Sequence, residues 1–210
     1  MKLLREYVEM VLLEKKQPFD MEEFRALKGD DAWEYLDFRC KVLGSGVGRE
    51  VFDTGLGYVI KMAKKHKPGM HQTTGGKRQN RREANIGRCD PTAPVPKVYA
   101  YAPDFSWIAV EKVKPLNWSK IDTAVKRLTK SRLHHALDLD GVIELLNIVS
   151  HPGEFPRHMR NDYVKLYETS PFFASLVDLV KSCGLDPDDF HNGNWGMTED
   201  GRLVLLDPGL

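Results

Sequence analysis

Cysteine is scarce in this 210-residue sequence, which contains only Cys40, Cys89 and Cys183. Their number is odd, they lie far apart, and no two of them form a Cys-x-x-Cys pair. A disulfide framework needs an even set of cysteines and a cysteine-rich zinc site needs closely spaced pairs, so the sequence disfavours both. The scarcity instead favours a protein of the reducing cytoplasm.

Long apolar runs and an excess of charge of one sign are also absent. No run approaches the roughly 20 apolar residues that a membrane-spanning helix needs. Charges interrupt the first residues at Lys2, Arg5 and Glu6, unlike a signal peptide. The 31 Lys and Arg residues nearly balance the 30 Asp and Glu residues, which leaves a net charge of +1. We therefore expect no membrane partner and, despite a basic stretch at residues 64–82, no nucleic-acid partner.

The hydrophobic pattern changes from strands to helices along the chain. An amphipathic helix is expected over Leu3–Leu12, Asp20 is expected to cap a second helix, and from about Trp33 the pattern predicts strands. The later strands are expected at Val51–Phe52, Tyr58–Met62, Lys97–Tyr101, Trp107–Val113, Asn194–Thr198 and Arg202–Leu206. The later helices are expected at Arg81–Arg88, 121–133, 138–150, 157–168 and 171–182. A strand-rich first half and a helix-rich second half predict an α+β protein of two lobes.

A glycine-rich loop, Gly44-Ser45-Gly46-Val47-Gly48, separates two of the expected strands. Glycine lets backbone amides approach a phosphate with no Cβ in the way. The loop does not lead into a helix, which disfavours a Rossmann fingerprint, and no Gly-Lys-Ser/Thr follows, which excludes a Walker loop. Taken alone, the loop is equally typical of a plain hairpin turn.

A lysine stands inside the apolar strand Val59-Ile60-Lys61-Met62. Taken alone, Lys61 would be an edge residue with its ammonium group in water. Glu83 follows 22 residues later on an expected helix. A strand lysine held by a helix glutamate can present its ammonium group to the phosphates of ATP. The pair therefore indicates a possible nucleotide site.

Acidic and amide side chains gather near the C-terminus. Asp189 and Asn194 lie in the segment Asp189-Phe190-His191-Asn192-Gly193-Asn194, and Asp207 follows the apolar strand Leu203-Val204-Leu205-Leu206. Together they supply oxygen ligands of the kind that Mg²⁺ prefers, with one carboxylate to spare.

These motifs resemble those of the protein-kinase-like superfamily, in the same order from about Leu43 to Gly209. The residues that carry the resemblance are Leu43–Phe52 as the nucleotide-covering loop, Lys61, Glu83, Trp107–Val113 as the strand entering the hinge, Asp189, Asn194 and Asp207. The resemblance implies a protein-kinase-like two-lobed fold. Its parts would be a helical extension at 1–32, an antiparallel-sheet N-lobe at 33–113 and a truncated helical C-lobe at 114–210.

The resemblance also implies ATP and Mg²⁺ as cofactors and a role for each site residue. Asp189 would be the catalytic base, Lys61 and Glu83 would complete the catalytic set, and Asn194 and Asp207 would bind the metal. The implied ATP-binding residues are Gly44, Ser45, Gly46, Gly48, Val51, Lys61, Glu111, Val113 and His191. The implied activity is transfer of the γ-phosphoryl group of ATP to a serine or threonine hydroxyl.

The sequence departs from the kinase pattern at several positions. Arg49 replaces the third glycine of the loop, and Pro208 replaces the phenylalanine of the Asp-Phe-Gly motif. His191 stands where protein kinases carry lysine. A histidine at this position resembles the aminoglycoside and choline phosphotransferases. The chain ends three residues after Asp207. A C-lobe this short resembles that of the short serine/threonine kinase-like proteins of tailed bacteriophages. Such a protein would act in the host cytoplasm.

Two other functions fit the same residues. A small-molecule phosphotransferase is favoured by His191 and by the lack of a peptide-binding platform. A non-catalytic pseudokinase, acting as a binding or inhibitory module, is favoured by Arg49, Pro208 and the short C-lobe. Retention of all five polar site residues argues against the pseudokinase, since a module released from chemistry does not need them. Those residues are Lys61, Glu83, Asp189, Asn194 and Asp207.

Overall fold

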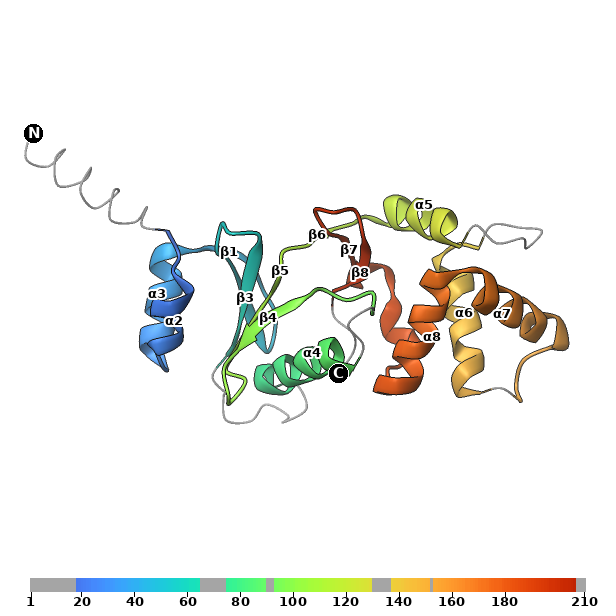
Figure 1. The fold of residues 1–210 in the computed structure, drawn as a ribbon, viewed down its shortest axis with the longest axis horizontal. Helices are drawn as coiled ribbons and strands as arrows, with labels where there is room; N and C mark the ends of the chain where they lie inside the picture. The colour runs from blue at the N-terminus through green and yellow to red at the C-terminus, as the bar shows by residue number, and fades with distance from the viewer. Residues whose placement is uncertain (1–17, 65–74, 90–92, 130–136, 152, 207–210) are drawn as a thin grey trace, which may run out of the picture. The chain divides into compact units, whose positions relative to one another are not determined.

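The computed structural model describes residues 18–64, 75–89, 93–129, 137–151 and 153–206. The helix expected over Leu3–Leu12 lies outside these residues. The chain divides into two compact units: the first runs to Arg81 and includes Val98–Lys112, and the second comprises Arg82–Lys97 and the chain from Val113 onward. Antiparallel strands and α-helices are both present (Figure 1), which confirms the α+β class. Among the described helices, none has the length and apolar character needed to cross a membrane.

The first unit contains a five-stranded antiparallel sheet in the order β1-β2-β3-β5-β4. Its strands are β1 (Lys41–Ser45), β2 (Arg49–Asp53), β3 (Tyr58–Ala63), β4 (Val98–Tyr101) and β5 (Trp107–Glu111). β2 to β5 coincide with predicted strands to within a few residues, whereas β1 covers only the end of the strand segment that was predicted from about Trp33. β1 forms one edge of the sheet and is exposed along its whole length.

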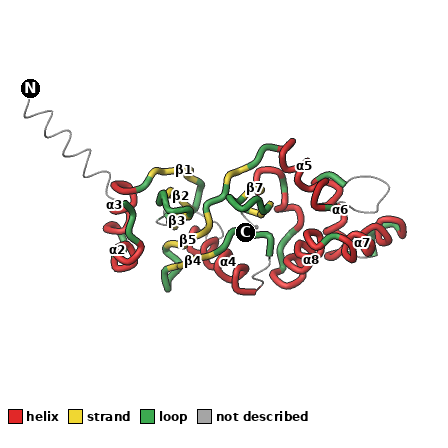
Figure 2. The backbone as a smooth tube through the Cα atoms, turned by 45° about the horizontal axis from the view of Figure 1, so that its top comes forward, coloured by secondary structure: helices red, strands yellow, loops and turns green. Residues whose placement is uncertain are grey.

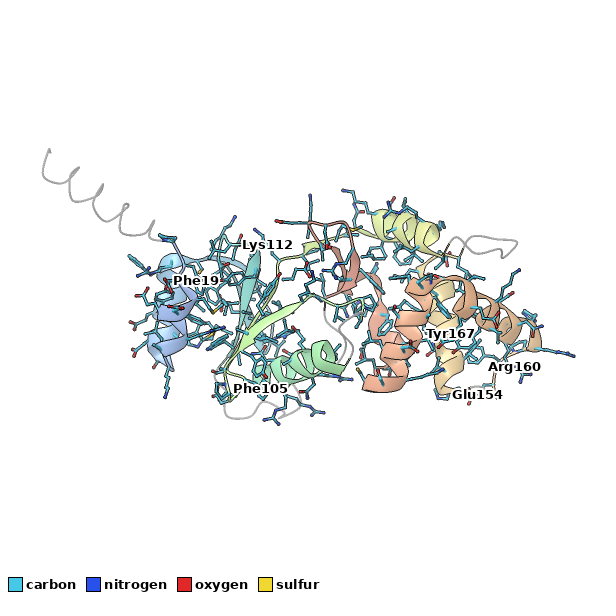
Figure 3. All side chains as sticks on the ribbon, viewed as in Figure 1. Phe19, Phe105, Lys112, Glu154, Arg160 and Tyr167 are labelled. Atoms are coloured by element: carbon cyan, nitrogen blue, oxygen red, sulfur yellow. The ribbon has the colours of Figure 1, made fainter. Side chains whose placement is uncertain are left out.

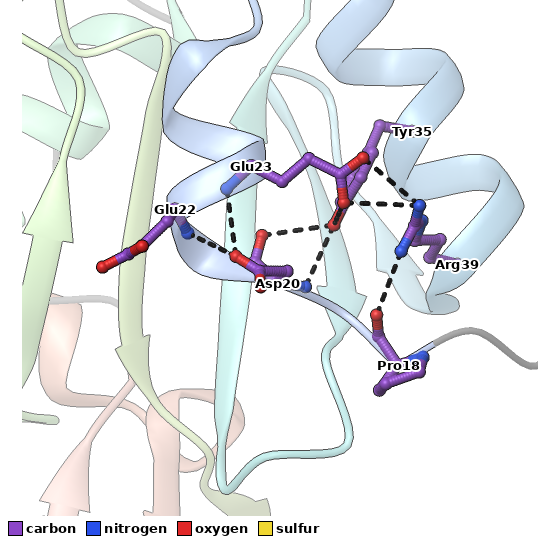
Figure 4. Close-up of polar contacts among 6 residues, drawn as sticks. All are labelled: Pro18, Asp20, Glu22, Glu23, Tyr35 and Arg39. Atoms are coloured by element: carbon purple, nitrogen blue, oxygen red, sulfur yellow. Dashed lines mark hydrogen bonds and ion pairs between the residues drawn. The ribbon is translucent and has the colours of Figure 1, made fainter.

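Two short helices, α2 (Met21–Ala26) and α3 (Asp30–Arg39), precede the sheet. The predicted cap is confirmed, since Asp20 Oδ1 accepts hydrogen bonds from the N–H groups of Glu22 and Glu23 at 2.8 and 3.0 Å. The hydroxyl of Tyr35 in α3 donates to Glu23 Oε2 at 3.0 Å, and Arg39 contacts the same carboxylate at 3.3 Å (Figure 4). These polar contacts hold α2 against α3.

The strand predicted from Trp33 through Phe38 is wrong, because these residues belong to α3. Asp30 and Asp31 in the first turn favour a helix by interacting with its dipole. Ala32 and Leu36, four residues apart, lie on one helix face and are both buried. The aromatic residues favoured a strand by propensity alone, which packing overrides.

One face of the sheet packs against α2 and α3. Phe52, Ile60 and Met62 share a buried cluster with Phe24 of α2 and Leu36 of α3. Side chains alternate between the two faces along a strand. Lys61, which lies between Ile60 and Met62, therefore belongs to the opposite face.

Helix α4 (Gly76–Cys89) starts five residues earlier than the predicted helix at Arg81. Its first residue lies close to backbone atoms of two other segments of the first unit. A Cβ added to Gly76 would meet the carbonyl oxygen of Gly48 and would lie 2.8 Å from Cα of Ala63. Glycine is thus required where α4 begins.

Replacement of Gly76 by alanine is expected to destabilise the protein by about 1–3 kcal/mol, the usual cost of overpacking. The gain in helix propensity, about 1 kcal/mol, is too small to offset a clash with backbone. Urea unfolding of Gly76→Ala and of Gly44→Ala measures the effect, because a Cβ at Gly44 would meet no atom within 4 Å. Equal unfolding midpoints for the two variants would contradict this packing.

The second unit is mainly helical (Figure 2). Its helices are α5 (Trp118–Leu128), α6 (Leu139–Ser150), α7 (Arg157–Thr169) and α8 (Pro171–Cys183). Four helices were predicted near these positions; α5 starts three residues early because Asn117 caps it, accepting from the N–H of Lys120. The predicted hairpin corresponds to β7 (Trp195–Met197) and β8 (Leu203–Leu205), and the unpredicted strand β6 (Lys114–Pro115) extends it to three strands.

Candidate functional site

The glycine-rich loop joins β1 and β2 as a tight hairpin. The N–H of Gly46 donates to the carbonyl of Arg49 at 2.8 Å, which closes the turn. Lys64 Nζ donates to Ser45 Oγ at 2.5 Å and to the carbonyl of Gly46 at 2.7 Å. Lys64 therefore ties the loop to the end of β3. The sequence assigned this lysine only to a basic stretch, since nothing in the spacing relates it to Ser45.

The face of the sheet opposite α2 and α3 carries two of the predicted nucleotide-binding side chains. Val51 pairs with Lys61 in the β2–β3 register, so the two side chains lie side by side on this face. Glu111 is the last residue of β5, and by the alternation of side chains it belongs to the same face as Trp107 and Ala109. Trp107 and Ala109 pack in the cluster on the face that meets α2 and α3. Glu111 can therefore contribute to the Lys61 face only through its backbone.

A buried asparagine that the sequence did not single out links the elements around Lys61. Asn80 of α4 donates from Nδ2 to the carbonyl of Lys61 at 3.3 Å and to that of Phe105 at 2.9 Å. Its Oδ1 accepts a hydrogen bond from Arg49 Nη1 at 3.4 Å. Arg49, which replaces the third glycine of the loop, is thus buried and held by α4.

Glu83 follows Asn80 by three residues, so the two residues share one face of α4. Its side chain is buried, with 9% of its surface exposed. Glu83 belongs to the second unit and Lys61 to the first. The predicted ion pair between Lys61 and Glu83 stays a prediction.

In the second unit, a compact loop brings Asp189 and Asn194 together. Asp189 lies in the 3-10 turn η2 (Pro187–Phe190), which Asp186 caps by accepting from the N–H of Asp188 at 3.0 Å. Asn194 closes a second 3-10 turn, η3 (Asn192–Asn194), and its Nδ2 donates to the carbonyl of Asp189 at 2.8 Å. The amide of Asn194 thus fixes the backbone that carries the predicted catalytic carboxylate.

A buried tryptophan, Trp195, holds this loop through a hydrogen bond and a ring contact. Trp195 Nε1 donates to the carbonyl of Phe190 at 2.7 Å, and the two rings meet edge to face with centroids 6.3 Å apart. Both side chains have no exposed surface. The sequence placed Trp195 only within the expected strand Asn194–Thr198, because a hydrogen bond from an indole to a loop carbonyl leaves no trace in a spacing pattern.

His191, predicted to contact the nucleotide, has a local structural role. Its Nδ1 accepts from the N–H of Gly193 at 3.3 Å and thereby caps η3. The side chain is otherwise exposed. A direct contact between His191 and the nucleotide stays a prediction.

Asn194 is the one residue of the predicted magnesium-ligand pair that the structure describes. Its Nδ2 is used within the loop, and no donor among the described residues is bonded to its Oδ1. The N–H of Leu206 donates to the carbonyl of Asn194 at 2.6 Å, and Asp207, the next residue in the sequence, lies outside the described residues. Within the described residues no three His, Cys, Asp or Glu side chains gather as a metal site. The ligand pair Asn194 and Asp207 stays a prediction.

A salt bridge lies just after β5, near the end of the segment Trp107–Val113 that the resemblance identifies as the strand entering the hinge. Lys112 Nζ lies 2.7 Å from Asp53 Oδ2 at the end of β2. Burial raises the pKa of Asp53, but the hydrogen bond from Lys112 and that from the N–H of Gly55 outweigh it, so the pKa is lowered. The pair therefore stabilises the folded sheet at neutral pH and loses that contribution as acid protonates Asp53.

Comparison with known proteins gives structural likenesses only. No protein-family model matches the chain, and no curated protein matches it. The aminoglycoside phosphotransferase APH(2'')-Ib bound to ADP has 17% identity over 84% of this chain and 69% of that chain, with a TM-score of 0.39. The streptomycin–ATP–APH(2'')-IIa ternary complex has 14% identity over 68% of this chain and 58% of that chain, with a TM-score of 0.33.

A choline kinase from Cryptosporidium parvum Iowa II is also similar, with 12% identity over 80% of this chain and 59% of that chain and a TM-score of 0.33. Both kinds of enzyme belong to the protein-kinase-like superfamily. The chain thus spans less than two thirds of the second and third structures. The narrower resemblance to bacteriophage proteins has no counterpart among these three and stays a prediction.

Proposed function

We propose that this chain is an ATP-dependent phosphotransferase that moves the γ-phosphoryl group of ATP to a hydroxyl group. The loop that joins Asp189 to Asn194 carries the proposal, because the hydrogen bond from Asn194 Nδ2 fixes the backbone of Asp189, whose side chain is half-buried. The face shared by Val51 and Lys61 supports it from the first unit. The acceptor we propose is a serine or threonine hydroxyl of a protein.

Each proposed residue has a definite task. Lys61 binds the α- and β-phosphates of ATP, and the amides of the glycine-rich loop cover the phosphates. Asp189 orients the acceptor hydroxyl and takes its proton as the new P–O bond forms and ADP leaves. Asn194 and Asp207 would hold Mg²⁺, which when bound neutralises charge on the transferred phosphoryl group.

Nucleotide binding is tested by thermal unfolding with Mg-ATP. ATP at 100 times its dissociation constant should stabilise the wild-type protein by about 2.7 kcal/mol. Lys61→Ala should reduce this shift, because it removes the cation expected at the phosphates. Lys41→Ala, an exposed lysine of the same sheet, is the matched control and should keep the full shift. No shift in the wild-type protein would favour the pseudokinase instead.

A small-molecule phosphotransferase is the second candidate, because His191, two residues after Asp189, stands where the resemblance places the histidine of aminoglycoside and choline phosphotransferases. The two acceptors are separated by γ-labelled ATP offered with casein-like proteins and, in parallel, with aminoglycosides, choline and sugars. Label in protein alone supports the protein kinase. Label in a small molecule alone supports the second candidate.

A further inference from the structure

The first unit contains a cavity that none of the proposed catalytic residues lines. Its volume is about 810 Å³, within the roughly 300–1,000 Å³ range of small-molecule sites. Helices α2 and α3 and the ends of β3, β4 and β5 enclose it. Its apolar wall is formed by Leu27, Trp33, Met62, Ala102 and Trp107. Such a wall suits the apolar body of a ligand.

Two helices begin at the cavity wall. Gly29, the N-cap of α3, supplies no side-chain acceptor to the free N–H groups of that helix. Gly76 and Lys77 begin α4, whose first turn contains no acidic residue. Helix N-termini carry a positive partial charge and free N–H donors. Asp30 and Asp31 in the first turn of α3 offset its positive end, so only the N-terminus of α4 adds positive potential at the cavity.

Four cationic side chains line the cavity, and two of them are already engaged. Lys64 donates to the glycine-rich loop, as described above. Lys77 Nζ lies 2.7 Å from Asp104 Oδ2, and this contact helps hold the pKa of Asp104 at about 2. Within the described residues, Arg25 and Lys28 form no ion pair. These two cations remain to receive an anion.

We infer that the cavity binds a small amphipathic anion, with its apolar body against Trp33 and Trp107 and its carboxylate or phosphate at Arg25 and Lys28. Charge complementarity carries the inference, since Arg25, Lys28 and the N-terminus of α4 have the same sign. Asp104, the one acidic residue of the wall, is neutralised by Lys77. The site is independent of the proposed phosphotransfer, because no proposed catalytic or metal-binding residue lines it.

Decanoate, below its micelle-forming concentration, is the probe. Tryptophan fluorescence should change with saturation, because Trp33 and Trp107 line the cavity, and Trp33→Phe should reduce the change. Decanol and decyltrimethylammonium, which share the chain but not the negative charge, should bind at least tenfold more weakly. The double variant Arg25→Glu/Lys28→Glu should weaken decanoate binding at least tenfold. Both residues are exposed, so the change leaves the core intact.

The control is Arg157→Glu/Arg160→Glu, which reverses two exposed charges on α7 (Figure 3) and should leave decanoate binding unchanged. Equal binding of decanoate and decyltrimethylammonium, an equal loss in both double variants, or no saturable change would overturn the inference. The Mg-ATP shift, measured on the same samples, should be the same in all of them. A result that contradicts anion binding in the cavity is therefore distinguishable from one that contradicts the proposed phosphotransferase activity.

Discussion

Asp189→Asn is expected to lower the rate of phosphoryl transfer by about 10²–10⁴-fold, the usual contribution of a general base. Asparagine keeps the size of the side chain but cannot take a proton from the acceptor hydroxyl. The backbone of the loop should not move, because Asn194 bonds to the carbonyl of residue 189 and not to its side chain. The Mg-ATP thermal shift should therefore be retained while turnover of γ-labelled ATP falls.

Asp188→Asn is the matched control for this prediction. Asp188 is the neighbouring carboxylate of the same 3-10 turn and is exposed, and among the described residues its side chain accepts only a long hydrogen bond of 3.4 Å from Asn147. Its replacement should change the transfer rate by less than about fivefold, since a weak surface contact contributes less than about 1 kcal/mol. Equal losses in the two variants would contradict the role of Asp189, and so would full activity of Asp189→Asn.

The sequence predicted the parts of the fold that local patterns determine. The apolar run around Lys61 and the helical periodicity at 171–182 correspond to β3 and α8, because each pattern depends on residues that are neighbours in the chain. α3 was missed because its buried face is short, with only Ala32 and Leu36, and three aromatic residues favoured a strand. Burial against the sheet decides the helix there, and burial by distant residues leaves no periodic signal.

The same limit applies to the candidate site. The types and order of Lys61, Asp189 and Asn194 were sufficient to predict a role for each, and these roles stay predictions. The sequence did not identify Asn80 or Lys64, whose side chains form hydrogen bonds with residues far away in the sequence. Such supporting contacts depend on the register of the sheet and the start of α4, and both are set only when the unit folds.

The second large effect, on stability, is expected where Trp195 packs against the loop that carries Asp189 and Asn194. Trp195→Ala should lower the free energy of unfolding by about 3–5 kcal/mol, because a fully buried aromatic side chain is replaced by a cavity. Trp195→Phe keeps most of the ring but removes the donor for the carbonyl of Phe190. It should cost about 1–3 kcal/mol, the penalty for a buried acceptor left without a partner.

Urea unfolding followed by circular dichroism measures both variants, with Trp118→Ala as the control. Trp118 is 41% exposed at the start of α5, so its loss should change stability by less than about 0.5 kcal/mol. Trp195→Phe, the variant expected to stay folded, should also reduce kcat while leaving the Mg-ATP thermal shift intact, because Phe190 adjoins Asp189 in η2. A Trp195→Phe protein with wild-type stability and turnover would show that this hydrogen bond does not position the loop.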